Sequence, residues 1–133
     1  MRIKTFLILP ISVAFFTLPL FAQGTPVAPL PSVPEDVAKT HLLRYKAPTY
    51  PSDAKRNCIE GDVVLELVIS ETGTVWHSTV LRGPALLTDS AVTAARKWVY
   101  DPYILGGKPV RYLTQATVHF RLPKSECPHR MPS

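Results

Sequence analysis

Side chains that could support catalysis or bind a metal are present, but they are scattered along the chain. A serine hydrolase brings a serine, a histidine and a carboxylate together, and a zinc site uses histidines or cysteines at close spacing. No nucleophile-elbow motif and no HxxxH pair occurs, so we expect no catalytic residue, no metal site and no cofactor. The candidates set aside on this ground are His41, His77, His119, His129, Ser78, Ser90, Asp89 and Asp101.

Two cysteines, Cys58 and Cys127, are the only thiols in the sequence. They form no CxxC motif, which argues against a zinc site. Two cysteines in an exported protein normally form one disulfide, and we expect that bridge here. Two free, buried thiols are the alternative.

The beginning of the sequence has the pattern of an export signal. Arg2 and Lys4 precede an uncharged, mostly apolar stretch, so residues 1–22 are predicted to be a cleaved signal peptide. The alternative is a retained membrane anchor. Pro10 and Pro19 disfavour it, because proline interrupts a spanning helix.

Composition divides the rest of the sequence. The 133 residues include 14 prolines, and four of these fall between positions 24 and 34. We expect residues 23–46 to be a proline-rich tether, residues 47–127 a single folded domain and residues 128–133 a tail. The net charge of +5 comes from scattered basic residues, so a nucleic-acid partner is not expected.

Hydrophobic periodicity predicts the elements of the domain. Apolar residues alternate over 62–70 as in a strand, and they recur every three or four positions over 87–98 as in a helix. Residues 35–46 fit either a short helix or an extended arm, and 104–109 are expected to form a loop. The expected elements are a helix at 52–57, strands at 62–70 and 75–82, a helix at about 86–99 and a strand at 110–122.

This order of elements predicts an α+β fold. We expect a two-layer sandwich in which a three-stranded antiparallel sheet, in the order 2-1-3, carries two helices packed on one face. The last strand would be an exposed edge, and Cys58 would lie beside Cys127 because the first strand begins where the last one ends. The expected core comprises Val63, Leu65, Leu67, Ile69, Ala91, Ala95, Trp98, Val118 and Phe120.

Several short motifs follow one another along the domain. They are PTYP at 48–51, IEGDV at 59–63, GTV at 73–75, WVYDP at 98–102, GKPV at 107–110 and VHF at 118–120. Over residues 48–122 this ordered set resembles the TonB C-terminal domain family of Gram-negative bacteria. The motif positions include Pro48, Tyr50, Pro51, Gly61, Gly73, Trp98, Tyr100 and Pro102.

The resemblance implies a binding protein rather than an enzyme. TonB-like domains act in transport and energy transduction in the periplasm, where they add an extended segment of an outer-membrane transporter to a sheet edge. Self-association through this edge, as a homodimer with a structural or assembly role, is the alternative. The protein would be periplasmic, or anchored in the inner membrane if residues 5–22 are retained. The implied partner-binding edge comprises Arg111, Leu113, Gln115, Thr117, His119 and Arg121.

Two features depart from the TonB pattern. The membrane anchor of TonB carries a histidine that couples it to a proton-driven motor, whereas the apolar segment here contains none. The predicted tether has 24 residues, which span at most about 75 Å as a polyproline helix. These differences favour partner binding without the transmission of force.

Overall fold

The computed structural model of the protein describes residues 28–127, and its main sheet has four strands. β3 (Gly61–Ile69) runs antiparallel to β8 (Tyr112–Phe120) and to β4 (Val75–Arg82), and β1 (Ser32–Val33) runs parallel to β8. The α+β class is as expected, but the prediction of a three-stranded sheet is wrong because β1 adds a fourth strand. In spatial order the strands are β1, β8, β3 and β4.

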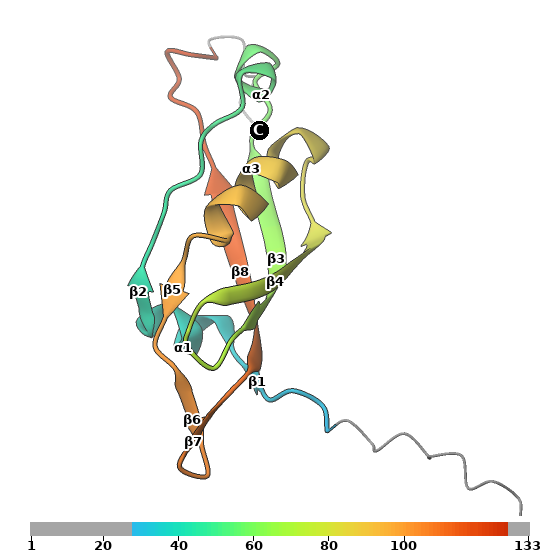
Figure 1. Ribbon diagram of the computed structural model, residues 1–133. Coiled ribbons are helices and arrows are strands. Elements are labelled where there is room, and N and C mark those ends of the chain that lie inside the picture. The colour runs from blue at the N-terminus through green and yellow to red at the C-terminus, as the bar shows by residue number, and fades with distance from the viewer. Residues whose placement is uncertain (1–27, 128–133) are drawn as a thin grey trace, which may run out of the picture.

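Three helices accompany the sheet, where two were predicted: α1 (Glu35–Thr40), α2 (Ser52–Arg56) and α3 (Ala85–Ala95). α3 lies across one face of the sheet (Figure 1). Ala91 and Ala95 are fully buried there, and their small side chains let the helix approach the strands closely. α3 ends earlier than predicted, because Arg96 and Lys97 form a turn that leads into a short strand. No helix within residues 28–127 is long and apolar enough to cross a membrane.

Two small strand pairs complete the fold (Figure 1). β2 (Leu42–Arg44) pairs with β5 (Val99–Tyr100), and β6 (Tyr103–Leu105) pairs with β7 (Lys108–Val110). The β6–β7 hairpin replaces the loop predicted at 104–109. Gly106 and Gly107 form its turn with φ angles of 60° and 78°, which glycine adopts without strain.

The segment expected to be a tether is part of the fold wherever the structure describes it. Residues 28–46 include β1, α1 and β2, and they bury Val33 and Ala38 in the core. Both alternatives for residues 35–46 occur in part, since a short helix is followed by a strand. The predicted signal peptide (1–22), the start of the predicted tether (23–27) and the predicted tail (128–133) lie outside the described residues.

The core and the disulfide form as predicted. Every residue of the expected core is buried between the sheet and α3. Cys58 and Cys127 are bonded, with their Cα atoms 5.8 Å apart. The bond joins the chain just before β3 to the chain after β8, at the end of the molecule where α2 lies (Figure 1).

Candidate partner-binding edge

β8 is the strand that the sequence predicted to bind a partner. It pairs with β3 over nine consecutive residues without a register shift. Alternate residues of an antiparallel strand direct their main-chain groups to opposite sides. The N–H groups of Leu113 and Thr117 bond to acceptors away from β3, so the odd-numbered residues direct theirs to the edge. The predicted edge residues are all odd-numbered: Arg111, Leu113, Gln115, Thr117, His119 and Arg121.

The first half of this edge is already occupied. β1 lies beside it in parallel register, with Ser32 opposite Leu113 and Val33 opposite Thr114. The Leu113 N–H donates a hydrogen bond of 2.8 Å to the Pro31 carbonyl. The expectation of an exposed edge is therefore wrong for this part of β8, because the protein's own N-terminal segment adds a strand to it.

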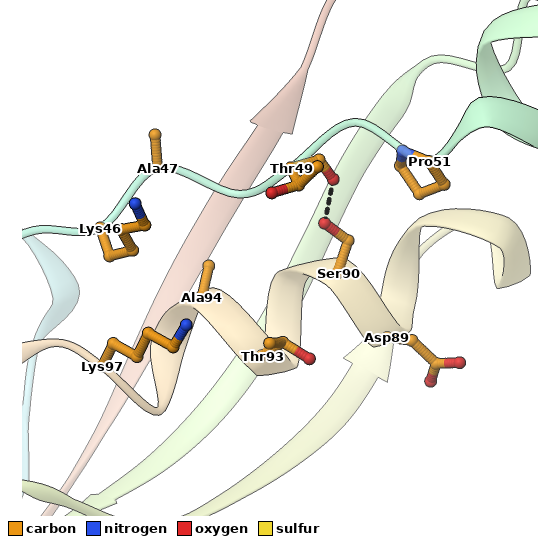
Figure 2. Close-up of a pocket in the computed structure, with 9 residues that line it drawn as sticks. All are labelled: Lys46, Ala47, Thr49, Pro51, Asp89, Ser90, Thr93, Ala94 and Lys97. Carbon is orange, nitrogen blue, oxygen red and sulfur yellow. Dashed lines mark hydrogen bonds between the residues drawn. The ribbon is translucent and has the colours of Figure 1, made fainter.

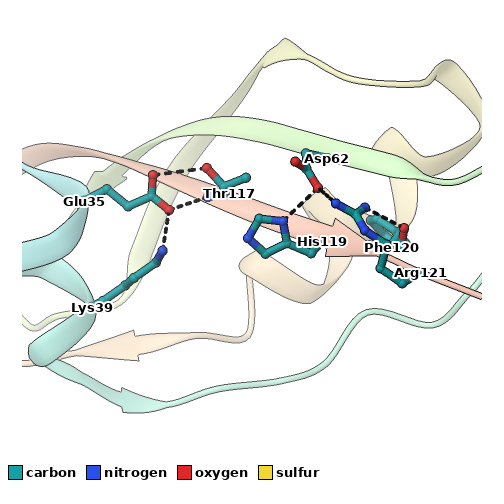
Figure 3. Close-up of polar contacts among 7 residues, drawn as sticks. All are labelled: Glu35, Lys39, Asp62, Thr117, His119, Phe120 and Arg121. Atoms are coloured by element: carbon teal, nitrogen blue, oxygen red, sulfur yellow. Dashed lines mark hydrogen bonds and ion pairs between the residues drawn. The ribbon is translucent and has the colours of Figure 1, made fainter. Parts of the chain in front are cut away.

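A carboxylate from α1 occupies the next position along the edge (Figure 3). Glu35 accepts hydrogen bonds from the Thr117 N–H at 2.8 Å and from the Thr117 hydroxyl at 3.1 Å. The Lys39 ammonium lies 2.9 Å from the same carboxylate, one helical turn further on. Charge-assisted hydrogen bonds of this kind are stronger than neutral ones. β1 and Glu35 together cover β8 from Leu113 to Thr117.

The ionised form of Glu35 is favoured by this arrangement. Partial burial by itself raises the pKa of the carboxyl group. The hydrogen bonds from Lys39 and Thr117 outweigh burial, so the pKa of Glu35 is lowered overall. The negative charge therefore helps to hold α1 against β8.

Beyond Thr117 the edge carries an exposed ionic cluster (Figure 3). One carboxylate oxygen of Asp62, on β3, lies 2.7 Å from His119 Nδ1 and 2.8 Å from an Arg121 guanidinium nitrogen. The hydrogen bond from His119, followed by that from Arg121, lowers the pKa of Asp62. The three side chains are 42–58% exposed, so water screens the cluster and it adds little stability.

Arg111, just before β8, is held by two contacts. Its Nε lies 3.1 Å from a carboxylate oxygen of Glu71, and its guanidinium carbon lies 4.6 Å from the centre of the Trp76 ring. A hydrogen bond from the main chain of Glu71 itself, and a second one from Arg111, lower the pKa of Glu71. Arg111 thus links the start of β8 to the β3–β4 turn and to β4.

Two of the three motif aromatics, Trp98 and Tyr50, fasten the segment before α2 to the core. Trp98 is only 4% exposed, and its Nε1–H donates a hydrogen bond of 2.8 Å to the Lys46 carbonyl. The Tyr50 hydroxyl donates to the Ile59 carbonyl, and its ring meets Phe120 edge-on with centroids 5.4 Å apart. These two motif positions are therefore structural.

Gly73 and Tyr100 form a second structural pair. Gly73 has a φ of 89°, and a Cβ atom there would lie 1.9 Å from the Tyr100 carbonyl oxygen, so the position requires glycine. The Tyr100 N–H donates a 2.8 Å hydrogen bond to the Gly73 carbonyl, and burial raises the pKa of the Tyr100 hydroxyl. The remaining motif residues lie before α2 (Pro48 and Pro51), at the start of β3 (Gly61) and after β5 (Pro102).

An open groove separates the segment before α2 from α3 (Figure 2). It has a volume of about 300 Å³, and Lys46 and Lys97 lie at one end of it. The Ser90 hydroxyl, on the α3 side, donates a hydrogen bond across the groove to the Thr49 carbonyl. That bond ties the two sides of the groove together, and no histidine is among the residues that line it.

Among the described candidates for hydrolytic or metal chemistry, His41 and Asp101 come together, but neither candidate serine bonds to them. His41 Nδ1 lies 3.5 Å from Asp101, and His119 bonds to Asp62. Ser78 Oγ is buried without a hydrogen-bond partner. Within residues 28–127, no serine hydroxyl bonds to a histidine and no cluster of His, Cys, Asp or Glu side chains could hold a metal. His129, another candidate, lies in the predicted tail outside the described residues.

Comparison with known proteins identifies the family. The family described as Gram-negative bacterial TonB protein C-terminal matches residues 46–122. The chain belongs to this family. Over 77 residues it is 32% identical to Protein TonB of Vibrio cholerae serotype O1, an alignment that covers 56% of this chain and 32% of that protein. It also resembles the solution NMR structure of the Pseudomonas aeruginosa TonB CTD, with a TM-score of 0.52, 28% identity, and coverage of 61% of this chain and 84% of that chain.

The extent of the match sets two limits. This chain spans about a third of the length of the Vibrio cholerae TonB relative. The matched TonB C-terminal range begins at residue 46, so β1, α1 and β2 all precede it. The segment that covers β8 therefore lies in front of the region that matches the TonB family.

Sequence reasoning missed the segment from Pro31 to Glu35. Two acidic residues, Glu35 and Asp36, followed by Lys39 four positions after Glu35, are typical of a helix start with an i,i+4 ion pair. That signal could have favoured the helix over the extended arm. It carries no information about docking on β8, because Glu35 and Thr117 are 82 positions apart in the chain.

Proposed function

We propose that this protein is a periplasmic TonB-like binding module in a transport and energy-transduction system. It would recognise an extended segment of a partner, an outer-membrane transporter, by adding that segment as a strand to β8. Membership of the TonB C-terminal family and the similarity to TonB of Vibrio cholerae support this role. The six edge residues from Arg111 to Arg121 would form the binding surface.

One observation carries the proposal. β8 already pairs with an added, extended segment, because β1 lies parallel to it and the Leu113 N–H bonds to the Pro31 carbonyl. Strand addition relies on main-chain hydrogen bonds for affinity and on side-chain positions for specificity. An edge that accepts a strand from its own chain has the regular geometry needed to accept one from a partner.

A titration followed by NMR tests the proposal. The ¹⁵N-labelled full chain is mixed with synthetic peptides that copy the N-terminal segments of outer-membrane transporters. We expect chemical-shift changes along residues 111–121, with β4 (75–82) as the matched strand that stays unchanged. Absence of changes at β8 would contradict the proposal. A sedimenting mass that rises with protein concentration, without any response to peptide, would favour the self-associating alternative.

A further inference from the structure

The segment from Pro31 to Glu35 satisfies β8 as a bound strand would. The Pro31 carbonyl accepts the Leu113 N–H, and Val33 is 8% exposed and belongs to the core cluster. Two residues after Val33, the Glu35 carboxylate accepts the N–H and the hydroxyl of Thr117. Five residues thus supply a main-chain contact, an apolar anchor and a charge-assisted cap.

The same segment is a poor template for a further strand. Pro31 and Pro34 flank the two residues of β1, and proline has no N–H to offer a neighbouring strand. Short edge strands bordered by proline are a known protection against unwanted pairing. The segment also precedes residues 46–122, the range that matches the TonB family. It therefore has the properties of a cover placed over the binding edge.

We propose that residues 31–35 are a built-in competitor for the partner-binding edge and that they mirror the chemistry of the partner. This inference rests on the proposed function. The partner segment is an extended peptide that runs parallel to β8. It places an apolar side chain in the Val33 position and a carboxylate two residues later, where Thr117 receives it.

The competing segment, residues 31–35, sets the apparent affinity of β8 for the partner. A partner can pair with Leu113 and Thr117 only in molecules whose own segment has left β8. The apparent dissociation constant is therefore the intrinsic constant divided by the fraction of molecules with an open edge. Changes that weaken docking of residues 31–35 raise this fraction, so they tighten partner binding even though they remove contacts from the free protein.

The test uses the ¹⁵N-labelled full chain in two single-substitution variants, each with a matched control variant. Val33→Asp places a charge in the apolar position, and Val37→Asp makes the same change at a valine of α1 that is 44% exposed. Glu35→Gln removes the carboxylate that Thr117 binds, and Asp36→Asn makes the equivalent change at its exposed neighbour. The probes are the transporter peptides and a synthetic peptide of this protein's own residues 28–38.

We expect Val33→Asp to tighten binding of the transporter peptides by about tenfold, equivalent to about 1.4 kcal/mol, and Glu35→Gln to tighten it by about threefold, equivalent to about 0.7 kcal/mol. The control variants should stay within about twofold of the unmodified protein. The 28–38 peptide should bind the Val33→Asp protein at β8, and a Gln in place of its Glu should weaken that binding by about threefold. A spin label on the N-terminus of the peptide should broaden the Leu113 signal more than that of His119, as parallel pairing requires.

The outcomes separate this inference from the proposed function. Transporter peptides that bind β8 equally in all five proteins would support the function and overturn the competitor. Binding of the 28–38 peptide alone would support the competitor and overturn the transporter role. Broadening at His119 rather than at Leu113 would overturn the parallel mimicry. Unchanged signals from Leu65 and Leu67 verify that each variant is folded, and binding by neither probe would overturn both proposals.

Discussion

The two edges of the main sheet are built differently. On one side β8 pairs with β3 over nine residues without a shift, and its outer side is covered by β1 and Glu35. On the other side β4 pairs with β3 through two register shifts. No strand of residues 28–127 pairs with the outer side of β4, where Trp76 is 62% and Leu81 46% exposed.

The difference shows two ways of protecting an edge. Register shifts bend and twist a strand and interrupt its row of hydrogen-bonding groups, so β4 is a poor template for another strand even when it is uncovered. β8 is regular and is therefore receptive, which makes it suitable for partner binding and also for unwanted pairing. Within residues 28–127, the regular edge therefore carries a proline-bordered strand and the irregular edge carries none.

The largest expected effect concerns the disulfide, which fastens the β8 side of the sheet and has no counterpart at β4. Replacing Cys58 and Cys127 by serine should lower the free energy of unfolding by about 4 kcal/mol, because the bond closes a long loop in the unfolded chain. Urea denaturation of the variant and of the original protein measures this difference. The original protein in reducing agent is the control and should match the variant, and a loss below about 1 kcal/mol would contradict the expectation.

An effect of intermediate size is expected when a substitution in β1, which covers β8, is compared with one in β4. Val33→Ala removes two buried methyl groups from β1 and should weaken its docking by about 1.5 kcal/mol. The Leu113 amide should then exchange its hydrogen about tenfold faster. Leu81→Ala, on β4, removes more carbon but from a side chain that is 46% exposed, and it should leave this exchange unchanged. Equal effects of the two substitutions on Leu113 would mean that β1 does not protect β8.

Local pattern and topology account for what the sequence could predict. The alternation in β3 identified Val63, Leu65, Leu67 and Ile69 as core residues, which the structure confirms. The position of the two cysteines around the long strands predicted their bond. Each of these signals is carried by residues that are close in sequence or fixed by the strand order.

The docking of residues 31–35 on β8 could not be predicted from local sequence pattern. β1 has two residues, which is too short to show a strand period, and the surrounding prolines are equally typical of a flexible tether. Docking of Glu35 depends on Thr117, a partner at the opposite end of the domain in sequence. The edge residues on β8 were identified from a family resemblance, and only the three-dimensional arrangement placed Pro31–Glu35 against them.

The smallest expected effect is the pH dependence of the docking of residues 31–35 on β8, which follows from the Glu35 carboxylate. Its pKa is lowered in the folded protein, so its contribution to docking is complete above the ordinary value of 4.5 and is lost as the pH falls through the lowered value. The measurement is the protection of the Thr117 amide from hydrogen exchange, corrected for the intrinsic exchange rate. This protection should stay constant from pH 7 to about pH 5 and then fall by about threefold. The change is modest because the carboxylate keeps some contact with water. Glu35→Gln should remove this dependence and leave the Thr79 amide of β4 unaffected. If the unmodified protein and the Glu35→Gln protein lose protection of Thr117 in parallel, the carboxylate does not hold the cover on β8, and the asymmetry between the two edges would then rest on β1 alone.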